Sequence, residues 1–199
     1  MERFLRKMTP NADTTILDIG GYPSTWQGLR IESQITILNI HPTEPIAPVV
    51  RTVVGDGCHL PYDETAFDIA FSNSVIEHLG TFERQVAFAN EARRVGKALW
   101  IQTPARTFFI EPHLLAPFVH YLPKRAQKRL LRYFTLWGIL GKPTRQDIDA
   151  FLNEVRLLSK SELCELFPDC QIIYERFAGL TKSFIAVRFA PPKPSARSV

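Results

Sequence analysis

The chain has 199 residues, of which 45% are hydrophobic and 22% are charged, and its formal net charge at neutral pH is +4. These values fit one globular domain with a sizeable core and require no second domain. The sequence has no apolar run of about eighteen residues and no signal-peptide core in residues 1–10, so we expect a cytoplasmic protein. Cys58, Cys164 and Cys170 follow no paired spacing, which indicates neither a disulfide framework nor a zinc site.

Strand and helix signals alternate along the first half of the chain. The apolar patterns predict strands over residues 14–19, 34–40, 49–55, 66–72 and 97–102. Helices are expected over residues 1–8, from 24 or 25 to 33, 74–79 and 82–94. This alternation predicts a parallel, doubly wound sheet.

The pattern resumes beyond Gln146. Ser159-x-x-Glu162 is a capping box that predicts a helix over residues 159–166. Strands are expected over residues 170–177 and 183–189, joined by a short loop at Gly179. Because a short loop makes a hairpin, one edge of the sheet should be antiparallel. The predicted domain is residues 1–190, and the Pro-, Ser- and Arg-rich residues 191–199 are expected to be a disordered tail.

The first candidate site is the turn after the first strand. Residues 14–19 lead into Gly20-Gly21, where a ligand can lie against bare backbone. Open α/β sheets build nucleotide pockets from such turns, at the carboxyl ends of the strands. The next glycine is Gly28, so the G-x-G-x-x-G fingerprint of nicotinamide dehydrogenases is not met. Alone, the turn is equally consistent with a simple tight turn.

Four motifs in order make the sequence specific. They are Ile-Leu-Asp18-Ile-Gly20-Gly21, Leu-Asn39-Ile40, Gly55-Asp56-Gly57-Cys58, and FDIAFSNSVIEHL over residues 67–79. Each follows or includes an expected strand, and together they resemble a class I S-adenosylmethionine-dependent methyltransferase of the small type 11 kind. The resemblance implies a Rossmann-like three-layer sandwich with a seven-stranded, mostly parallel sheet whose last strand is antiparallel.

The resemblance also implies a binding site for S-adenosylmethionine at the ends of the first four strands. The implied cofactor-binding residues are Asp18, Gly20, Gly21, Asn39, Ile40, Asp56, Gly57, Cys58, Ser72 and Asn73. The glycine turn would receive the methionyl end of the cofactor. Asp18 would accept a hydrogen bond from the methionyl amino group, unless Asp18 only fixes the turn. Ser72 and Asn73 would edge the same end.

The remaining residues of this implied site face the nucleoside. Ile40 would lie on one face of the adenine. Asp56 would accept a hydrogen bond from the exocyclic amine of the adenine, unless Asp56 is simply a turn residue. Gly57 and Cys58 would lie beside the adenine. The family has an acid where this chain has Asn39. An amide accepts one ribose hydroxyl and lacks the charge that strengthens the bond, and Asn39 could equally cap its strand.

Catalytic and acceptor residues are expected beyond the fourth strand. His78 would lie one turn into the next helix, and an imidazole of ordinary pKa near 6.5 suits a general base, although it could be structural. A metal site at Glu77, His78 and His113 is conceivable, but we expect none. Arg106, Glu111 and His113 are candidate substrate-binding residues.

Positive charge is concentrated in residues 104–146. Eight basic residues and one acidic residue give this segment +7, which leaves −3 for the rest of the chain. We expect a helical insertion here that forms a lid, with apolar residues at helical spacing over 124–140. Its basic residues could hold an anionic acceptor, rest on a membrane face, or simply be solvated. A nucleic-acid partner is disfavoured, because the charge is confined to one segment.

The sequence therefore predicts a methyltransferase that acts on an oxygen, or secondarily a nitrogen, of a small-molecule or glycan-type acceptor. The alternative is a non-catalytic binding or scaffolding module with a degenerate cofactor site, which the two-glycine turn and Asn39 would mark. The oligomeric state is left open.

Overall fold

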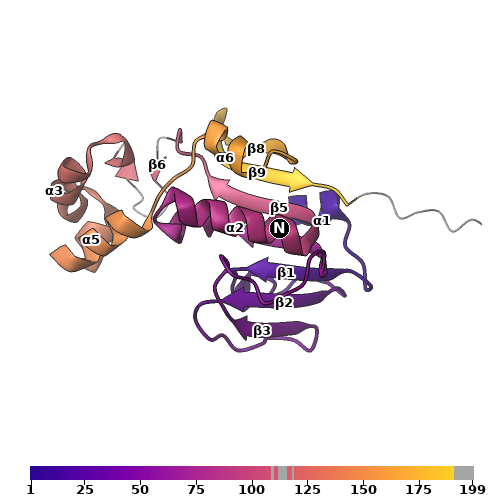
Figure 1. Cartoon of the computed structure of the whole chain (residues 1–199). Coiled ribbons are helices and arrows are strands. Elements are labelled where there is room, and N and C mark those ends of the chain that lie inside the picture. The colour runs from indigo at the N-terminus through magenta and orange to yellow at the C-terminus, as the bar shows by residue number, and fades with distance from the viewer. Residues whose placement is uncertain (109, 112–115, 118, 191–199) are drawn as a thin grey trace, which may run out of the picture.

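A seven-stranded sheet forms the centre of the molecule (Figure 1). The computed structural model describes residues 1–108, 110–111, 116–117 and 119–190, and the expected tail at 191–199 lies outside them. The strand order is β3-β2-β1-β4-β5-β9-β8. The strands are β1 (Thr15–Ile19), β2 (Gln34–Asn39), β3 (Val50–Val54), β4 (Phe67–Asn73), β5 (Gly96–Pro104), β8 (Gln171–Phe177) and β9 (Leu180–Arg188).

The pairing confirms the Rossmann-like fold expected from the sequence. Strands β1 to β5 pair in parallel, and β9 runs antiparallel to both β5 and β8. The chain builds outward from β1 through β2 to β3, then returns to the other side of β1 with β4. This reversal leaves a crevice at the carboxyl ends of β1 and β4, which is where open α/β sheets bind ligands.

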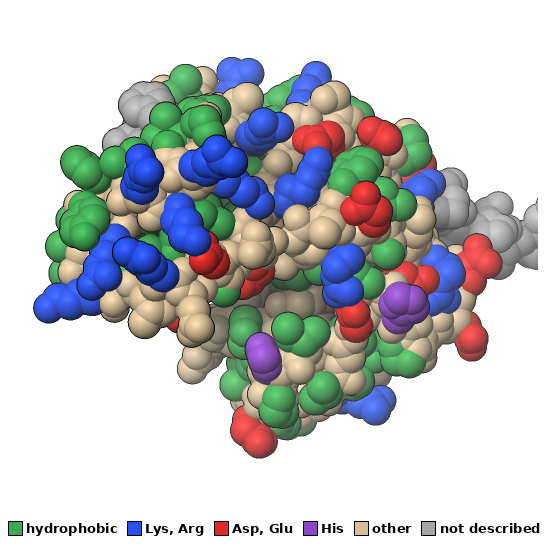
Figure 2. Space-filling view, turned by 60° about the vertical axis from the view of Figure 1, so that its left-hand side comes forward, with side chains coloured by type: hydrophobic (Ala, Val, Ile, Leu, Met, Phe, Trp, Pro, Cys, Tyr) green, Lys and Arg blue, Asp and Glu red, His purple; other side chains and the backbone are tan. Residues whose placement is uncertain are grey.

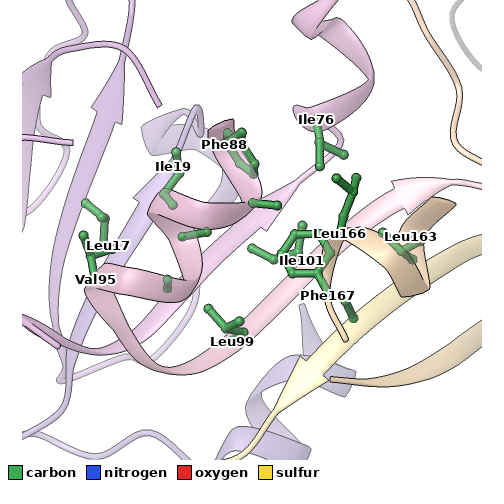
Figure 3. Packing of buried hydrophobic residues seen from close by; sticks show 14 of the residues in the cluster. Leu17, Ile19, Ile76, Phe88, Val95, Leu99, Ile101, Leu163, Leu166 and Phe167 are labelled. Carbon is green, nitrogen blue, oxygen red and sulfur yellow. The ribbon is translucent and has the colours of Figure 1, made fainter. Parts of the chain in front are cut away.

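Helices cover both faces of the sheet. Helices α2 (Phe82–Val95) and α6 (Lys160–Leu166) pack on one face, where Phe88 and Leu163 meet side chains such as Ile19 and Ile101 (Figure 3). Helix α1 (Glu2–Met8) covers the opposite face, where Phe4 contacts three other aromatic rings. Burial on both faces explains why the central strands are nearly continuous apolar runs.

Two of the predicted helices are shorter or absent. Residues 24–33 form only the single turn η1 (Pro23–Thr25) followed by further turns, so the predicted helix is wrong. Gly28 lies within that span at a φ of +76°, which an α-helix does not contain. The helix expected over 74–79 is the short turn η2 (Ile76–Leu79), which ends at Gly80. The capping box at Ser159 and Glu162 is confirmed.

The helical insertion differs most from the sequence prediction. It comprises η3 (Val119–Tyr121), α3 (Lys124–Phe134), α4 (Leu136–Gly141) and α5 (Arg145–Glu154), together with the short strands β6 (Ile110–Glu111) and β7 (Ala116–Pro117) that precede them. The continuous helix expected over 124–140 is broken at Thr135. Its hydroxyl donates to the Leu131 carbonyl at 2.7 Å and accepts from the Gly138 amide at 2.8 Å, so one residue ends α3 and caps α4.

The insertion has a small core of its own. Val119, Leu131, Ile148 and Leu152 are buried together, separately from the two clusters that cover the sheet. Helix α5, which the sequence analysis did not predict, carries the insertion past Gln146 to Glu154. None of the helices in the described part of the chain is both long and apolar enough to span a bilayer.

Candidate functional site

A cavity of about 520 Å³ opens at the carboxyl ends of β1, β2 and β3. Of the residues singled out in the sequence, Gly20, Asn39, Ile40, Asp56, Gly57 and His78 line it. Its remaining walls are mostly apolar. They include Ile19, Leu38, Val75, Leu79 and Phe88. A largely apolar pocket with a few polar groups is the usual form of a small-molecule site.

The glycine turn leaves no room for a side chain. Gly20 has a φ of +79°, and a Cβ there would lie 2.4 Å from Cγ1 of Val75. A Cβ on Gly21 would lie 1.9 Å from Oδ2 of Asp18. Both positions therefore need glycine, and the cavity meets bare backbone at Gly20.

Asp18 is fully buried beneath this turn. Its Oδ2 accepts a hydrogen bond from Nε1 of Trp26 at 2.7 Å, while Oδ1 has no hydrogen-bond partner among the described residues. Burial raises the pKa of Asp18 from 3.8 to about 7, and the bond from Trp26 only partly opposes this. A buried, unpaired acceptor is costly, and a donor group brought by a ligand or water would relieve it.

Asn39 is committed to the glycine turn. Its Nδ2 donates to the carbonyl oxygens of Gly20 and Gly21, at 3.2 and 2.9 Å, and its Oδ1 accepts from the amide of His41 at 3.0 Å. The side chain thus clamps the turn from the end of β2, and both of its polar atoms are engaged. An aspartate here would face two carbonyl oxygens with no hydrogen to donate.

Asp56 lies on the opposite side of the cavity, paired with a residue that sequence reasoning missed. Its Oδ1 accepts from the Cys58 amide at 2.9 Å, and Arg84 of α2 approaches its Oδ2 at 3.1 Å. The Cys58 amide and the Arg84 guanidinium lower the pKa of Asp56. Burial raises the pKa of the Cys58 thiol to about 11, so that sulfur stays protonated at neutral pH.

Five expected cofactor residues are not among those that line this cavity: Asp18, Gly21, Cys58, Ser72 and Asn73. Ser72 is buried, and its hydroxyl donates to the Ile19 carbonyl at 2.9 Å, which joins β4 to β1. Asn73 lines a separate small cavity with Phe71 and Gln102. The reason is the strand period of two, which puts Asn73 on the same sheet face as Phe71.

His78 and Glu154 meet at the edge of the cavity. Nδ1 of His78 lies 3.0 Å from Oε1 of Glu154, and both residues line the pocket. His78 belongs to η2 and Glu154 ends α5, so the contact joins the sheet region to the insertion. If Nδ1 carries the proton, the carboxylate fixes the ring and the basic lone pair is on Nε2.

A polar clamp holds η2 against the chain that follows α5. Gln85 donates through Nε2 to the carbonyls of Ile76 and Arg156, both at 2.9 Å. Arg156 donates through NH1 to Oε1 of Gln85 at 2.6 Å, and its amide donates to the Glu77 carbonyl at 2.7 Å. Buried, mutually bonded groups of this kind fix geometry, so the position of His78 is well defined.

The candidate acceptor residues are not gathered at the cavity. Arg106 is exposed, and its amide donates to the Leu158 carbonyl at 3.3 Å. Glu111 is placed only by its backbone in β6, and His113 lies outside the described residues. No cluster of three or more metal-ligating side chains occurs among the residues that the structure describes.

Solved structures with the same fold span almost the whole chain. One is a chain of the complex between the Haloferax volcanii Trm112 methyltransferase activator and a putative methyltransferase, with 12% identity, a TM-score of 0.59, and coverage of 96% of this chain and 87% of that one. Another is the Burkholderia thailandensis 1,6-didemethyltoxoflavin-N1-methyltransferase with S-adenosylhomocysteine, with 15% identity, a TM-score of 0.56, and coverage of 94% and 74%. A SAM-dependent methyltransferase from Aquifex aeolicus has 12% identity, a TM-score of 0.52, and coverage of 94% and 87%.

The sequence itself gives a more specific match. No curated protein matches it, but residues 29–98 match the family model described as a methyltransferase domain. Residues 29–98 are therefore similar to a methyltransferase domain, and the whole chain has the fold of the solved methyltransferases described above. The matched segment includes Asn39, Asp56 and His78 and excludes the glycine turn, whose place in the site depends on the geometry described above.

Three residues in or beside the candidate site were missed in the sequence. Trp26 belongs to a stretch predicted to be helical, and Glu154 ends a helix that was not predicted. Arg84 follows the N-cap Thr81 of α2 by three residues, which places it at the helix end that faces the strand ends. Arg84 carried a usable signal because its helix was correctly predicted, and the capping box Thr144 and Asp147 could have revealed the helix of Glu154.

Proposed function

We propose that this chain is an S-adenosylmethionine-dependent methyltransferase that binds its donor in the 520 Å³ cavity and transfers the methyl group to an oxygen of an anionic small-molecule or glycan-type acceptor. The observation that carries the proposal is the His78–Glu154 pair at the edge of that cavity. S-adenosylmethionine supplies an electrophilic methyl group on a sulfonium. The protein then has to align the acceptor, exclude water and remove a proton.

The residues present fit the donor. The unpaired Oδ1 of Asp18 and the side-chain-free turn at Gly20 suit the methionyl ammonium, reached directly or through water. The partly exposed Asp56 carboxylate suits the adenine amine, with Ile40 as an apolar surface for the ring. We assign Asn39 to the turn itself, since its amide is already engaged there.

Gly21, Gly57 and Cys58 complete the proposed donor site through their backbone. Ser72 and Asn73, in contrast, are assigned no donor contact, because one is bonded to Ile19 and the other opens to a different cavity.

His78 is proposed as the general base for a hydroxyl acceptor. The Glu154 carboxylate at Nδ1 would orient the ring, and the imidazole would take up the hydroxyl proton. Glu154 acts through His78 and is therefore a positioning residue. A nitrogen acceptor stays the second candidate, since the similar Burkholderia thailandensis enzyme is named as an N1-methyltransferase.

Calorimetry with S-adenosylhomocysteine tests the donor site. We expect binding that Asp56→Ala weakens by about tenfold, the loss of one charge-assisted hydrogen bond. Asp63→Ala is the matched control, because Asp63 is exposed and does not line the cavity. Absence of binding to the folded protein at millimolar ligand contradicts the proposal and favours a non-catalytic module.

The acceptor requires a separate screen. Labelled donor is incubated with the purified protein and sugar phosphates, lipid-linked glycans, small phenols and amines. Transfer to an anionic hydroxyl compound supports the proposal, whereas transfer to amines alone assigns the chain to the nitrogen-methylating class.

A further inference from the structure

The outer surface of the helical insertion is far more basic than its packing requires. Four basic residues of α3 recur at helical spacing, and Arg145 of α5 joins them along a groove of about 560 Å³. They are Arg125, Lys128, Arg129 and Arg132. Figure 2 shows Lys and Arg side chains gathered on this part of the surface, with hydrophobic side chains beside them.

Little negative charge balances this groove. Lys128 forms an ion pair with Asp149 at 2.6 Å, and within the described ranges no other groove cation has a carboxylate within 4.0 Å. Four guanidinium groups thus share one surface without internal partners. Such an arrangement attracts an external polyanion, because like charges held close together repel one another until counterions or a ligand neutralise them.

Large apolar side chains are exposed on α3 and on the next helix, α4. The exposed fractions are 68% for Tyr133, 67% for Phe134, 55% for Ile139 and 73% for Leu140. The insertion buries Leu131, Ile148 and Leu152 in its own core, so these four are not needed for its folding. Apolar groups clustered this way on a surface mark an interaction site.

We propose that the α3–α4 surface docks on an anionic phospholipid bilayer. The basic groups would contact the headgroup phosphates while the aromatic and aliphatic side chains enter the boundary with the acyl chains. A second copy of this chain fits less well, since a two-fold contact would bring arginines against arginines. Nucleic acid fits less well because only Tyr133 and Phe134 offer rings on which bases could stack, whereas the aliphatic Ile139 and Leu140 suit acyl chains.

The docked orientation has a consequence for the donor cavity. Helix α5 lines the basic groove through Arg145 and Ile148, and its last residue, Glu154, contacts His78 at the cavity. Docking through the insertion would therefore hold the cavity near the lipid surface and let it take an acceptor from there. This last step rests on the proposed function, whereas docking itself does not.

Vesicle sedimentation with the full chain tests the docking. We expect binding to vesicles of phosphatidylcholine mixed with an equal amount of phosphatidylglycerol, weak binding to phosphatidylcholine alone, and a decrease as salt is raised. The combined variant Arg125→Gln, Arg129→Gln, Arg132→Gln should bind on the order of 100-fold more weakly. Removing three exposed charges elsewhere, with Arg6→Gln, Lys7→Gln and Arg30→Gln, is the matched control and should change binding little.

The apolar contribution needs its own variant. Phe134→Ser with Leu140→Ser keeps every charge and should weaken binding to the mixed vesicles by at least about tenfold. Thermal melts of all variants check folding, and calorimetry with S-adenosylhomocysteine on the same samples should give unchanged donor binding. If the unaltered protein does not bind S-adenosylhomocysteine, that result would contradict the proposed function and leave the docking result intact.

Several results would overturn the docking proposal. They are equal binding to neutral and anionic vesicles, undiminished binding by the charge variant, and displacement of the protein from vesicles by soluble glycerophosphate at equal phosphate concentration. A dimer that the apolar variant dissociates, without vesicle binding, would assign the surface to a second copy. Binding to an oligonucleotide but not to vesicles would assign it to nucleic acid.

Discussion

The strand ends that form the 520 Å³ cavity and the helical insertion satisfy their polar groups in opposite ways. Around the cavity, Asn39, Asp56 and Ser72 each bond to nearby backbone, so the turn and strand ends are already fixed. On the insertion, four arginines face solvent without a partner in the described chain. The cavity is therefore preorganised for a small ligand, whereas the charges of the insertion can be neutralised only by a partner or counterions outside the described chain.

The largest expected effect concerns the one contact that joins the two regions. His78→Asn should lower kcat for transfer to a hydroxyl acceptor by about 100- to 10,000-fold, because the proposed general base is lost. Glu154→Gln should lower kcat by about tenfold with little change in KM, since it removes only the group that orients the ring. Steady-state kinetics with the screened acceptor measure both effects.

His59→Asn is the control for His78, because His59 is exposed and does not line the cavity. Full activity of the His78 variant would show that positioning alone suffices and that the ring is structural.

Asp18 gives the next largest effect, on stability. The folded carboxyl keeps its proton up to about pH 7, while the unfolded one releases it near 3.8. The contribution of Asp18 to the free energy of unfolding therefore falls as the pH rises from about 4 to about 7, by up to ~1.4 kcal/mol per pH unit, and is constant outside that range. Asp18→Asn should remove this slope while keeping the bond from Trp26.

Denaturant unfolding of both proteins across that pH range measures the difference. Parallel curves for the wild type and Asp18→Asn would contradict a raised pKa at this position. The variant should also bind S-adenosylhomocysteine more weakly, because its amide cannot pair with the ammonium.

These sites also show which parts of the molecule the sequence can predict. The strands and their order follow from local apolar patterns, and Gly20, Asn39 and Asp56 follow directly from strand ends. Their arrangement in one cavity could be expected, because parallel strands bring their carboxyl ends to a common edge. What each side chain bonds to could not, since Asn39 was expected to face a ribose and instead holds a turn nineteen residues earlier.

The insertion was harder to predict for a physical reason. Apolar spacing ran through Thr135 without interruption, and only the hydrogen bonds of its hydroxyl divide α3 from α4. Helix α5 has the capping box Thr144 and Asp147 and carries Ile148, Phe151 and Leu152 at helical spacing, but these signals lie just past Gln146, where the expected insertion ended, and were not used. Glu154 was missed with it, because its contact with His78 spans 76 residues.

The glycine turn gives a smaller effect with an unusually close control. Gly20 and Gly28 have similar positive φ angles, but a Cβ at Gly20 would overlap Val75 and one at Gly28 would meet nothing within 4 Å. Alanine at either position should destabilise the fold by ~1–2 kcal/mol, because an alanine disfavours the left-handed backbone conformation. Only Gly20→Ala should also weaken binding of S-adenosylhomocysteine, by about 100-fold, because the turn has to shift. Calorimetry on both variants measures the affinity for S-adenosylhomocysteine. An equal change of affinity in the two variants would mean that the ligand does not contact the turn at Gly20.

The smallest expected effect discriminates most sharply between the family pattern and this structure. If Asn39 is a weakened ribose ligand, Asn39→Asp should restore the acid of the family and tighten binding of S-adenosylhomocysteine. The structure predicts the reverse, about tenfold weaker binding, because a carboxylate would face the Gly20 and Gly21 carbonyls and leave them without a donor. Asn73→Asp makes the same chemical change at the end of β4, outside the cavity, and should leave affinity unchanged. Tighter binding by Asn39→Asp alone would mean that the side chain turns to the ligand when the donor binds, and that the cavity is less preorganised than its hydrogen bonds indicate.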